Sequence, residues 1–177
     1  MKPETLASEP IYKGKIFDVR RDAIREGKAE YDRDVIVHPG SAVIIPVFAD
    51  NTVALVRQYR HAAGKYLLEI PAGSLDPDES PETGAARELE EEIGVRAEKI
   101  EKIAEFYVSP GFLTEKMYLY LATGLTETAQ RLDDDEFVEI ERIPLETALE
   151  MVRTGTIEDA KTIVGITLAA SRFGYSL

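Results

Sequence analysis

The sequence has 177 residues, of which 44% are hydrophobic, 33 are acidic, 21 are basic and none is cysteine. That length favours one compact chain with a real core, and the missing cysteine excludes disulfides and thiolate chemistry. The net charge of −12 argues against nucleic acid or an anionic membrane as a partner. No apolar run approaches the roughly 20 residues that span a bilayer, and the N-terminus lacks a signal-peptide pattern, so we expect a cytoplasmic protein.

Short strands dominate the chain, with few helices among them. Two hairpins are predicted first, one turning at residues 25–28 and the next at 49–51. The expected strands are 15–24, 30–38, 42–48, 52–60, 65–71, 99–108, 116–123 and 136–143. Helices are expected at 145–153 and 158–173. Strands on both sides of one central helix, followed by a terminal helix, suit an α/β sandwich.

The central helix is expected between Ser80 and Gly94. A serine followed by proline is a good helix start, and glycine commonly ends a helix. At about 100° of rotation per residue, Glu88, Glu91 and Glu92 share one face beside an apolar stripe. The spacing therefore predicts a cluster of three carboxylates at the edge of the buried face.

Such a cluster needs a counter-charge, because like charges at these spacings repel. A divalent metal is one source, since hard cations such as Mg²⁺ and Mn²⁺ prefer oxygen ligands. The alternative is a solvated acidic helix face. The three glutamates by themselves do not separate these two interpretations.

A longer pattern around the helix favours the metal. Residues 73–95 read as glycine, five residues, glutamate, seven residues, and then R-E-hydrophobic-x-E-E-x-G-hydrophobic. This segment resembles the Nudix box, the motif of the Nudix hydrolases. Every fixed position of that motif is met, by Gly73, Glu79, Arg87, Glu88, Leu89, Glu91, Glu92, Gly94 and Val95.

The resemblance implies a fold, a reaction and a cofactor. The fold is an α/β/α sandwich with a mixed sheet, here preceded by an N-terminal β-hairpin extension. The reaction is hydrolysis of a nucleoside diphosphate linked to another group, with Mg²⁺ or Mn²⁺ as cofactor and two or more ions in each site. The implied metal ligands are Glu88, Glu91, Glu92 and the Ala72 carbonyl, while Glu79 pairs with Arg87 to fix the loop against the helix.

Three further stretches resemble the ADP-ribose pyrophosphatase branch of the family. They are VRQYR at 56–60, LEIPAG at 68–73 and SPGF at 109–112. The resemblance implies substrate binding by Arg57, Arg60, Glu69, Ser109, Gly111 and Glu115. A solvated strand edge is the alternative for the two arginines, although a guanidinium suits phosphate. A plain turn is the alternative for SPGF.

The implied activity is conversion of ADP-ribose, and of related ADP-sugars, to AMP and a sugar phosphate such as ribose 5-phosphate. A further carboxylate has to orient or deprotonate the attacking water. The acidic run 133–136 offers candidates, and the resemblance favours Glu136. Two other interpretations remain open. One is a Nudix pyrophosphatase of different specificity, such as a GDP-mannose hydrolase, and the other is a non-catalytic module that binds nucleotide sugars.

The N-terminal strands precede the part of the chain that resembles the family core. We therefore expect residues 1–40 to form a strand extension that serves dimerisation, and residues 41–177 to form the Nudix domain. A homodimer is the predicted assembly. The expected partner is a small nucleotide sugar, with neither nucleic acid nor membrane involved.

Overall fold

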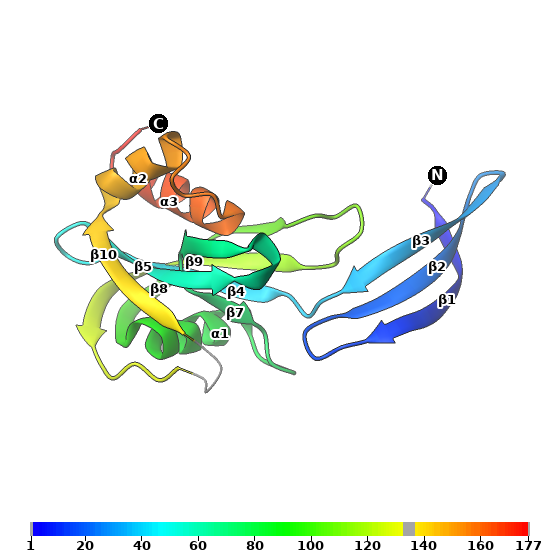
Figure 1. The fold of residues 1–177 in the computed structure, drawn as a ribbon, viewed down its shortest axis with the longest axis horizontal. Helices are drawn as coiled ribbons and strands as arrows, with labels where there is room; N and C mark the ends of the chain where they lie inside the picture. The colour runs from blue at the N-terminus through cyan, green and yellow to red at the C-terminus, as the bar shows by residue number, and fades with distance from the viewer. Residues whose placement is uncertain (1, 133–136, 177) are drawn as a thin grey trace. The chain divides into compact units, whose positions relative to one another are not determined.

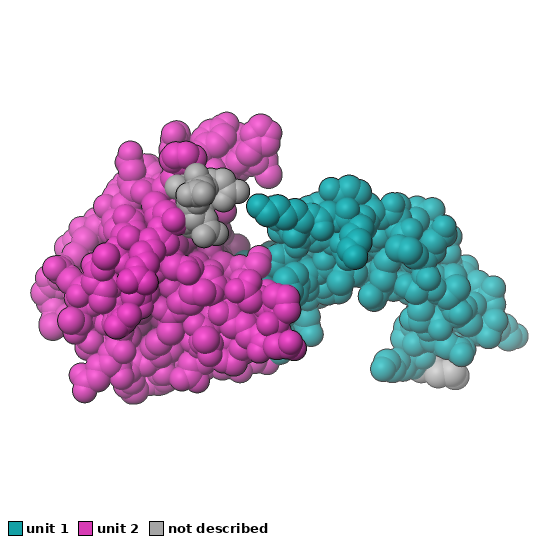
Figure 2. All heavy atoms as spheres, turned by 90° about the horizontal axis from the view of Figure 1, so that it is seen from below, with its two compact units in different colours: residues 1–40, 106–117 teal, residues 41–105, 118–177 magenta. Residues whose placement is uncertain are grey.

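The computed structural model describes residues 2–132 and 137–176. The chain forms two compact units, coloured separately in Figure 2. The first unit contains residues 1–40 and 106–117, and the second contains residues 41–105 and 118–177. Across the described residues, no helix is long and apolar enough to cross a membrane.

The first unit is built on an antiparallel three-stranded sheet with the order β1-β2-β3. Its strands are β1 (Glu4–Lys13), β2 (Asp18–Glu26) and β3 (Ala29–Val37). The predicted hairpin is confirmed as β2 and β3, but β1 was not expected. Every side chain of β1 is exposed. The strand therefore lacks the alternation of buried and exposed residues by which a strand is recognised in a sequence.

Residues 106–117 belong to the first unit through backbone hydrogen bonds to the end of β3. The Ile36 amide donates to the Phe112 carbonyl at 2.7 Å, and the Thr114 amide donates to the Ile36 carbonyl at 2.9 Å. The Thr114 hydroxyl oxygen also accepts a hydrogen bond from the His38 amide at 2.9 Å. The turn at 109–112 therefore lies beside the end of β3.

The second unit contains two sheets. One is four-stranded with the order β7-β4-β9-β8, and the other is three-stranded with the order β10-β5-β6. The strands are β4 (Ser41–Pro46), β5 (Thr52–Arg60), β6 (Lys65–Glu69), β7 (Ala72–Ser74), β8 (Val95–Tyr107), β9 (Lys116–Glu127) and β10 (Val138–Pro144). The helices are η1 (His61–Ala63), α1 (Pro81–Glu88), η2 (Leu89–Ile93), α2 (Leu145–Arg153) and α3 (Ala160–Arg172). The distal end of β8 and the first residues of β9 fall in the first unit.

The second predicted hairpin is wrong. The chain does turn between β4 and β5, where the Asn51 amide donates to the Phe48 carbonyl at 2.9 Å. The two strands nevertheless enter different sheets, and only an isolated bridge between Val47 and Val53 joins them. All of β4 is buried, as are residues 53–56 of β5, and each strand pairs with neighbours from elsewhere in the chain.

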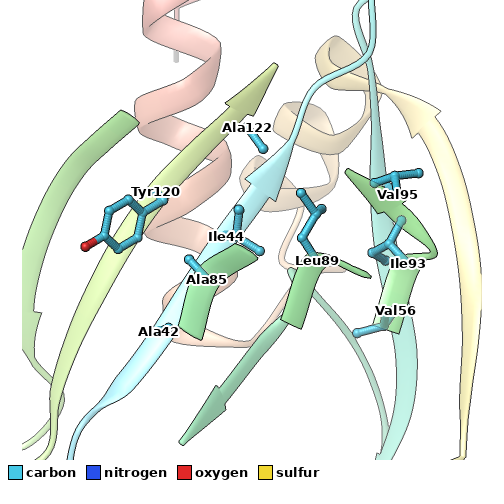
Figure 3. Close-up of a cluster of buried hydrophobic side chains, with 10 residues drawn as sticks. Ala42, Ile44, Val56, Ala85, Leu89, Ile93, Val95, Tyr120 and Ala122 are labelled. Carbon is cyan, nitrogen blue, oxygen red and sulfur yellow. The ribbon is translucent and has the colours of Figure 1, made fainter. Parts of the chain in front are cut away.

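Helices cover both faces of the sheet that contains β4, with α1 on one side and α2 and α3 on the other (Figure 1). Alternate residues of β4 and β9 pack against the central helix, while α3 contacts β4 and its Gly165 lies beside Leu119 of β9. The cluster on the α1 side is shown in Figure 3 and includes Ala42, Ile44, Val56, Ala85, Leu89, Ile93, Val95, Tyr120 and Ala122. The predicted α/β sandwich is confirmed.

Candidate functional site

The central helix starts and ends where the sequence predicts, but its last turn is different. Ser80 caps the first turn by accepting a hydrogen bond from the Thr83 amide at 3.2 Å. Gly94 ends the helix with a positive φ of 71°, a conformation that favours glycine. Between them, η2 (Leu89–Ile93) is a π-helical turn. The uniform rotation of 100° per residue is therefore wrong beyond Glu88, and such π turns often occur at functional sites.

Arg87 holds the acidic residues of the box together. Its Nε and Nη2 atoms donate to the two carboxylate oxygens of Glu79, both at 3.0 Å. Its Nη1 atom donates to Glu88 Oε1 at 2.6 Å and to Glu91 Oε2 at 2.9 Å. Nη2 also reaches the Ser74 carbonyl at 3.3 Å. The partner Glu79 was predicted from the sequence, but the hydrogen bonds from the same guanidinium to two of the predicted metal ligands, Glu88 and Glu91, were not.

The pKa values of this pair shift in the directions that mutual stabilisation requires. The hydrogen bonds with Glu79 raise the pKa of Arg87, against the opposing effect of burial, and the nearby Glu88 and Glu91 add to the increase. The hydrogen bonds from Arg87 likewise lower the pKa of the Glu79 carboxyl. Both groups are therefore charged at neutral pH.

Of the three clustered glutamates Glu88, Glu91 and Glu92, two are buried against β7. Glu88 is 6% exposed and Glu92 is 2% exposed. A Cβ atom on Gly73 would lie 1.8 Å from Glu88 Oε1, so only glycine allows the backbone to approach this carboxylate. The Ala72 amide donates to Glu92 Oε2 at 3.2 Å. The loop and the helix thus meet at Glu88 and Glu92.

Carboxylate oxygens beside a close backbone suit a hard divalent cation. In residues 2–132 and 137–176, however, no group of three or more His, Asp or Glu side chains has a geometry that could hold a metal ion. The positive charge beside Glu88 and Glu91 is instead the Arg87 guanidinium, whose Nη1 atom donates to both carboxylates.

A second charged cluster, which we call the Arg60 cluster, consists of Arg60, Glu69, Asp159 and Lys161. Arg60 forms a bidentate ion pair with Glu69, with both N···O distances at 2.7 Å. The buried amine of Lys161 also donates to Glu69, and it lies 3.1 Å from Asp159. Burial opposes the ionisation of Glu69, but the hydrogen bond from Arg60 and the charge of Lys161 outweigh it and lower the pKa.

Arg60 is electrostatically linked to the box. The hydrogen bond with Glu69 is the main cause of its raised pKa, which burial opposes, and the charges of Glu69, Glu92 and Asp159 contribute further. Its side chain is 41% exposed, so it can meet a ligand in solution. Arg57, three residues earlier on β5, instead pairs with Glu141 of β10 and is 40% exposed.

The remaining predicted residues lie elsewhere. Ser109, Gly111 and Glu115 belong to the first unit. The Ser109 carbonyl accepts hydrogen bonds from two amides of its own turn, and Glu115 Oε1 is 3.8 Å from His38 Nδ1. Residues 133–136, and with them the predicted base Glu136, lie outside the described residues.

Lys161 was not among the residues predicted from the sequence. It is 6% exposed and lies in α3 on the same stripe as the buried Gly165 and Ala169, at intervals of four residues. A lysine on the apolar stripe of a helix is a signal, because a buried amine requires an acidic partner. The partner Glu69 is 92 residues away along the chain, so the sequence could not identify it.

The fold and the site belong to a known class of protein. The family model described as NUDIX domain matches residues 38–164. The chain belongs to the NUDIX family.

Individual relatives carry different names. The chain is 39% identical over 170 residues to the ADP-ribose pyrophosphatase of Bacillus subtilis, an alignment that covers 94% of this chain and 91% of the relative. It is 36% identical to the methanol dehydrogenase activator of Bacillus methanolicus, with coverage of 92% and 90%. It is also 36% identical to the GDP-mannose pyrophosphatase of Cronobacter sakazakii, with coverage of 84% and 81%.

A solved structure supports the fold. The crystal structure of an ADP compounds hydrolase superposes with a TM-score of 0.85 at 22% sequence identity, and the match covers 98% of this chain and 97% of the other. At that identity the likeness bears on the fold alone.

Proposed function

We propose that this protein is a divalent-metal-dependent hydrolase that cleaves the diphosphate of ADP-ribose, and of related ADP-sugars, to release AMP and a sugar phosphate. The observation that carries the proposal is the position of the box carboxylates. Glu88 and Glu92 are buried against the backbone of β7, where Gly73 leaves room for no side chain. The relationship to the Bacillus subtilis enzyme, over 94% of this chain, supports ADP-ribose as the substrate.

Mg²⁺ or Mn²⁺ would be held by Glu88, Glu91, Glu92 and the Ala72 carbonyl, with two or more ions in the site. Bound there, the metal would neutralise phosphate charge and make the attacking water more acidic. Arg87 supplies positive charge to Glu88 and Glu91 in the absence of metal. It also keeps the loop fixed to the helix through Glu79.

Other residues would bind the substrate. The Arg60 guanidinium suits a bidentate hydrogen bond to phosphate oxygens, and Glu69 would act through Arg60, since its buried carboxylate is bonded to that side chain. We assign Arg57, Ser109, Gly111 and Glu115 to the same task. For the reaction, water adds across the bond between one phosphorus and the bridging oxygen, forming AMP and, from ADP-ribose, ribose 5-phosphate. Glu136 would accept the proton from that water.

A GDP-mannose hydrolase is the second candidate, favoured by the relative from Cronobacter sakazakii that is 36% identical over 162 residues. The test is a panel of ADP-ribose, ADP-glucose, GDP-mannose and diadenosine compounds with Mg²⁺, read by release of AMP or GMP. We expect the highest kcat/KM for ADP-ribose. A higher value for GDP-mannose would support the second candidate. Tight binding with no nucleotide release would instead indicate a binding module.

We also propose a homodimer that assembles through the first unit. Its exposed hydrophobic side chains are Leu6, Ile11 and Tyr12 of β1, and Ile16 and Phe17 of the connection between β1 and β2. Large apolar side chains on the surface of one small unit commonly mark an interface. Sedimentation at micromolar concentration should show twice the chain mass of 19.7 kDa. A species of the single-chain mass alone would contradict the dimer. Cytoplasmic location and the lack of nucleic-acid and membrane partners stay predictions.

A further inference from the structure

The buried carboxylate of Glu69 has two cationic partners that differ in exposure. The Arg60 side chain is 41% exposed, whereas that of Lys161 is 7% exposed. Glu69 itself is 1% exposed. A carboxylate so deeply buried is stable only while a cation compensates it. Either partner can provide that compensation, but only one of them can reach solvent.

Lys161 is held where it is by the start of α3. Asp159 caps this helix by accepting hydrogen bonds from the amide and the hydroxyl of Thr162, at 2.9 and 2.6 Å. The Lys161 amine lies 3.1 Å from the same carboxylate. Thr162 in turn accepts a hydrogen bond from the Ile70 amide at 2.9 Å, which ties the residue after Glu69 to the helix. The amine of Lys161 is therefore fixed beside Glu69.

Arg60 is less constrained. Its Nε and Nη2 atoms are both on Glu69, so a bidentate bond from that edge to phosphate requires Arg60 to leave the carboxylate. Without another cation, this movement would leave a buried charge uncompensated and would be strongly disfavoured. With Lys161 in place, Glu69 keeps a partner.

We propose that Lys161 is a positioning residue that compensates Glu69 while Arg60 turns from Glu69 to a phosphate of the nucleotide sugar. The inference rests on the proposed function, because it takes a diphosphate as the ligand of Arg60. It assigns Lys161 no contact with the substrate. Lys161 therefore matters for binding only while Glu69 carries a charge.

The test measures the Kd of ADP-ribose by calorimetry in EDTA, where no turnover occurs, and the KM with Mg²⁺. Lys161→Met should weaken binding by about tenfold to a hundredfold, the value of a hydrogen bond between charged groups. The KM should rise in parallel, while kcat stays within about threefold. The matched control is Lys65→Met. Lys65 lies on β6, as Glu69 does, but it is exposed and pairs with Glu158. This variant should leave both Kd and KM unchanged.

The decisive comparison is made in the Glu69→Gln background. There, adding Lys161→Met should change the Kd by less than about twofold, because the neutral amide needs no cation. If Lys161→Met alone does not fold, the comparison of Glu69→Gln with the double variant still tests the role of Lys161. A double variant that binds clearly less tightly than Glu69→Gln would overturn the proposal, and so would unchanged Kd and KM in a folded Lys161→Met.

Failure of the proposed function is distinguishable from failure of this inference. If the wild-type protein neither binds nor hydrolyses ADP-ribose, the function is wrong, and the inference that depends on it is withdrawn as well. If the wild-type protein is active and Lys161→Met binds normally, only the role of Lys161 is wrong.

Discussion

The box and the Arg60 cluster both contain buried glutamates, but the sequence separation between each glutamate and its cationic partner differs. In the box, Arg87 is adjacent to Glu88 and four residues from Glu91, so one helical segment supplies the cation and both of the carboxylates. In the Arg60 cluster, Glu69 is paired with Arg60, nine residues away, and with Lys161, 92 residues away. The first arrangement forms with the helix, and the second requires α3 to dock.

This difference assigns different tasks to the two regions. In the box, the cation that pairs with Glu88 and Glu91 comes from the same helix, and in the proposed function a metal would take its place. In the Arg60 cluster, Glu69 has a second cation from α3, which in the proposed role of Lys161 would free the exposed Arg60 for a ligand. We therefore expect changes in the box to act on kcat and metal binding, and changes in the Arg60 cluster to act on KM.

The largest effect is expected for Glu92→Gln. It should lower kcat by about 10⁴-fold or more, because loss of a metal ligand impairs both charge neutralisation and water activation, each worth roughly 10²-fold or more. Metal-free stability should not fall, since the change removes a buried charge. Steady-state kinetics and urea denaturation in EDTA measure the two effects. The control is Glu90→Gln in the same helical turn, where the glutamate pairs with the exposed Arg96, and its activity should match wild type.

The next largest effect concerns Glu136. If it is the base, Glu136→Gln should lower kcat by roughly 10²–10⁴-fold with a much smaller change in KM. The metal affinity of the free enzyme should hardly change, unlike that of the box variants. Metal titrations alongside kinetics measure both quantities. Normal activity in Glu136→Gln, together with loss of activity in an Asn variant at residues 133–135, would move the role to that aspartate.

A smaller effect is expected for Arg87→Gln in the absence of metal. Glu79, Glu88 and Glu91 would lose charged hydrogen bonds, which should lower the free energy of unfolding by about 1–3 kcal/mol. Saturating Mg²⁺ should reduce this difference, because metal replaces the lost positive charge. Arg96→Gln, which breaks the pair between the exposed Arg96 of β8 and Glu90 of η2, should show no measurable loss. Equal urea midpoints for Arg87→Gln and wild type in EDTA would refute the counter-charge role.

The smallest effect is a dependence of stability on acid pH. Hydrogen bonds from Arg87 lower the pKa of Glu79 in the folded protein, whereas the unfolded value is about 4.3. The stabilisation is therefore complete above about pH 4.3 and is lost as the pH falls through the lower folded value. Urea midpoints measured between about pH 6 and pH 3 should fall less in Arg87→Gln than in wild type. Parallel curves would show that the pair contributes nothing.

Much of the fold and of the candidate site could be predicted from the sequence, because the residues that define these features are close together in the chain. The box, its helix ends and the pairing of Glu79 with Arg87 all lie within residues 73–95. Contacts made through space were missed or misjudged. The hairpin expected at 49–51 was wrong because β4 and β5 take partners from separate sheets, and β1 was missed because it buries no side chain. The partner of Lys161 depends on how α3 docks, which periodicity does not report.

The central claim is that the box performs the chemistry while the Arg60 cluster binds the substrate. The most direct measurement is a side-by-side comparison of kcat and KM for ADP-ribose hydrolysis with Mg²⁺ in wild type, Glu92→Gln and Arg60→Ala. We predict that Glu92→Gln loses kcat with little change in KM, and that Arg60→Ala raises KM by about tenfold or more with kcat largely retained. A wild-type protein that releases no AMP, or two variants that change the same constant, would contradict the account.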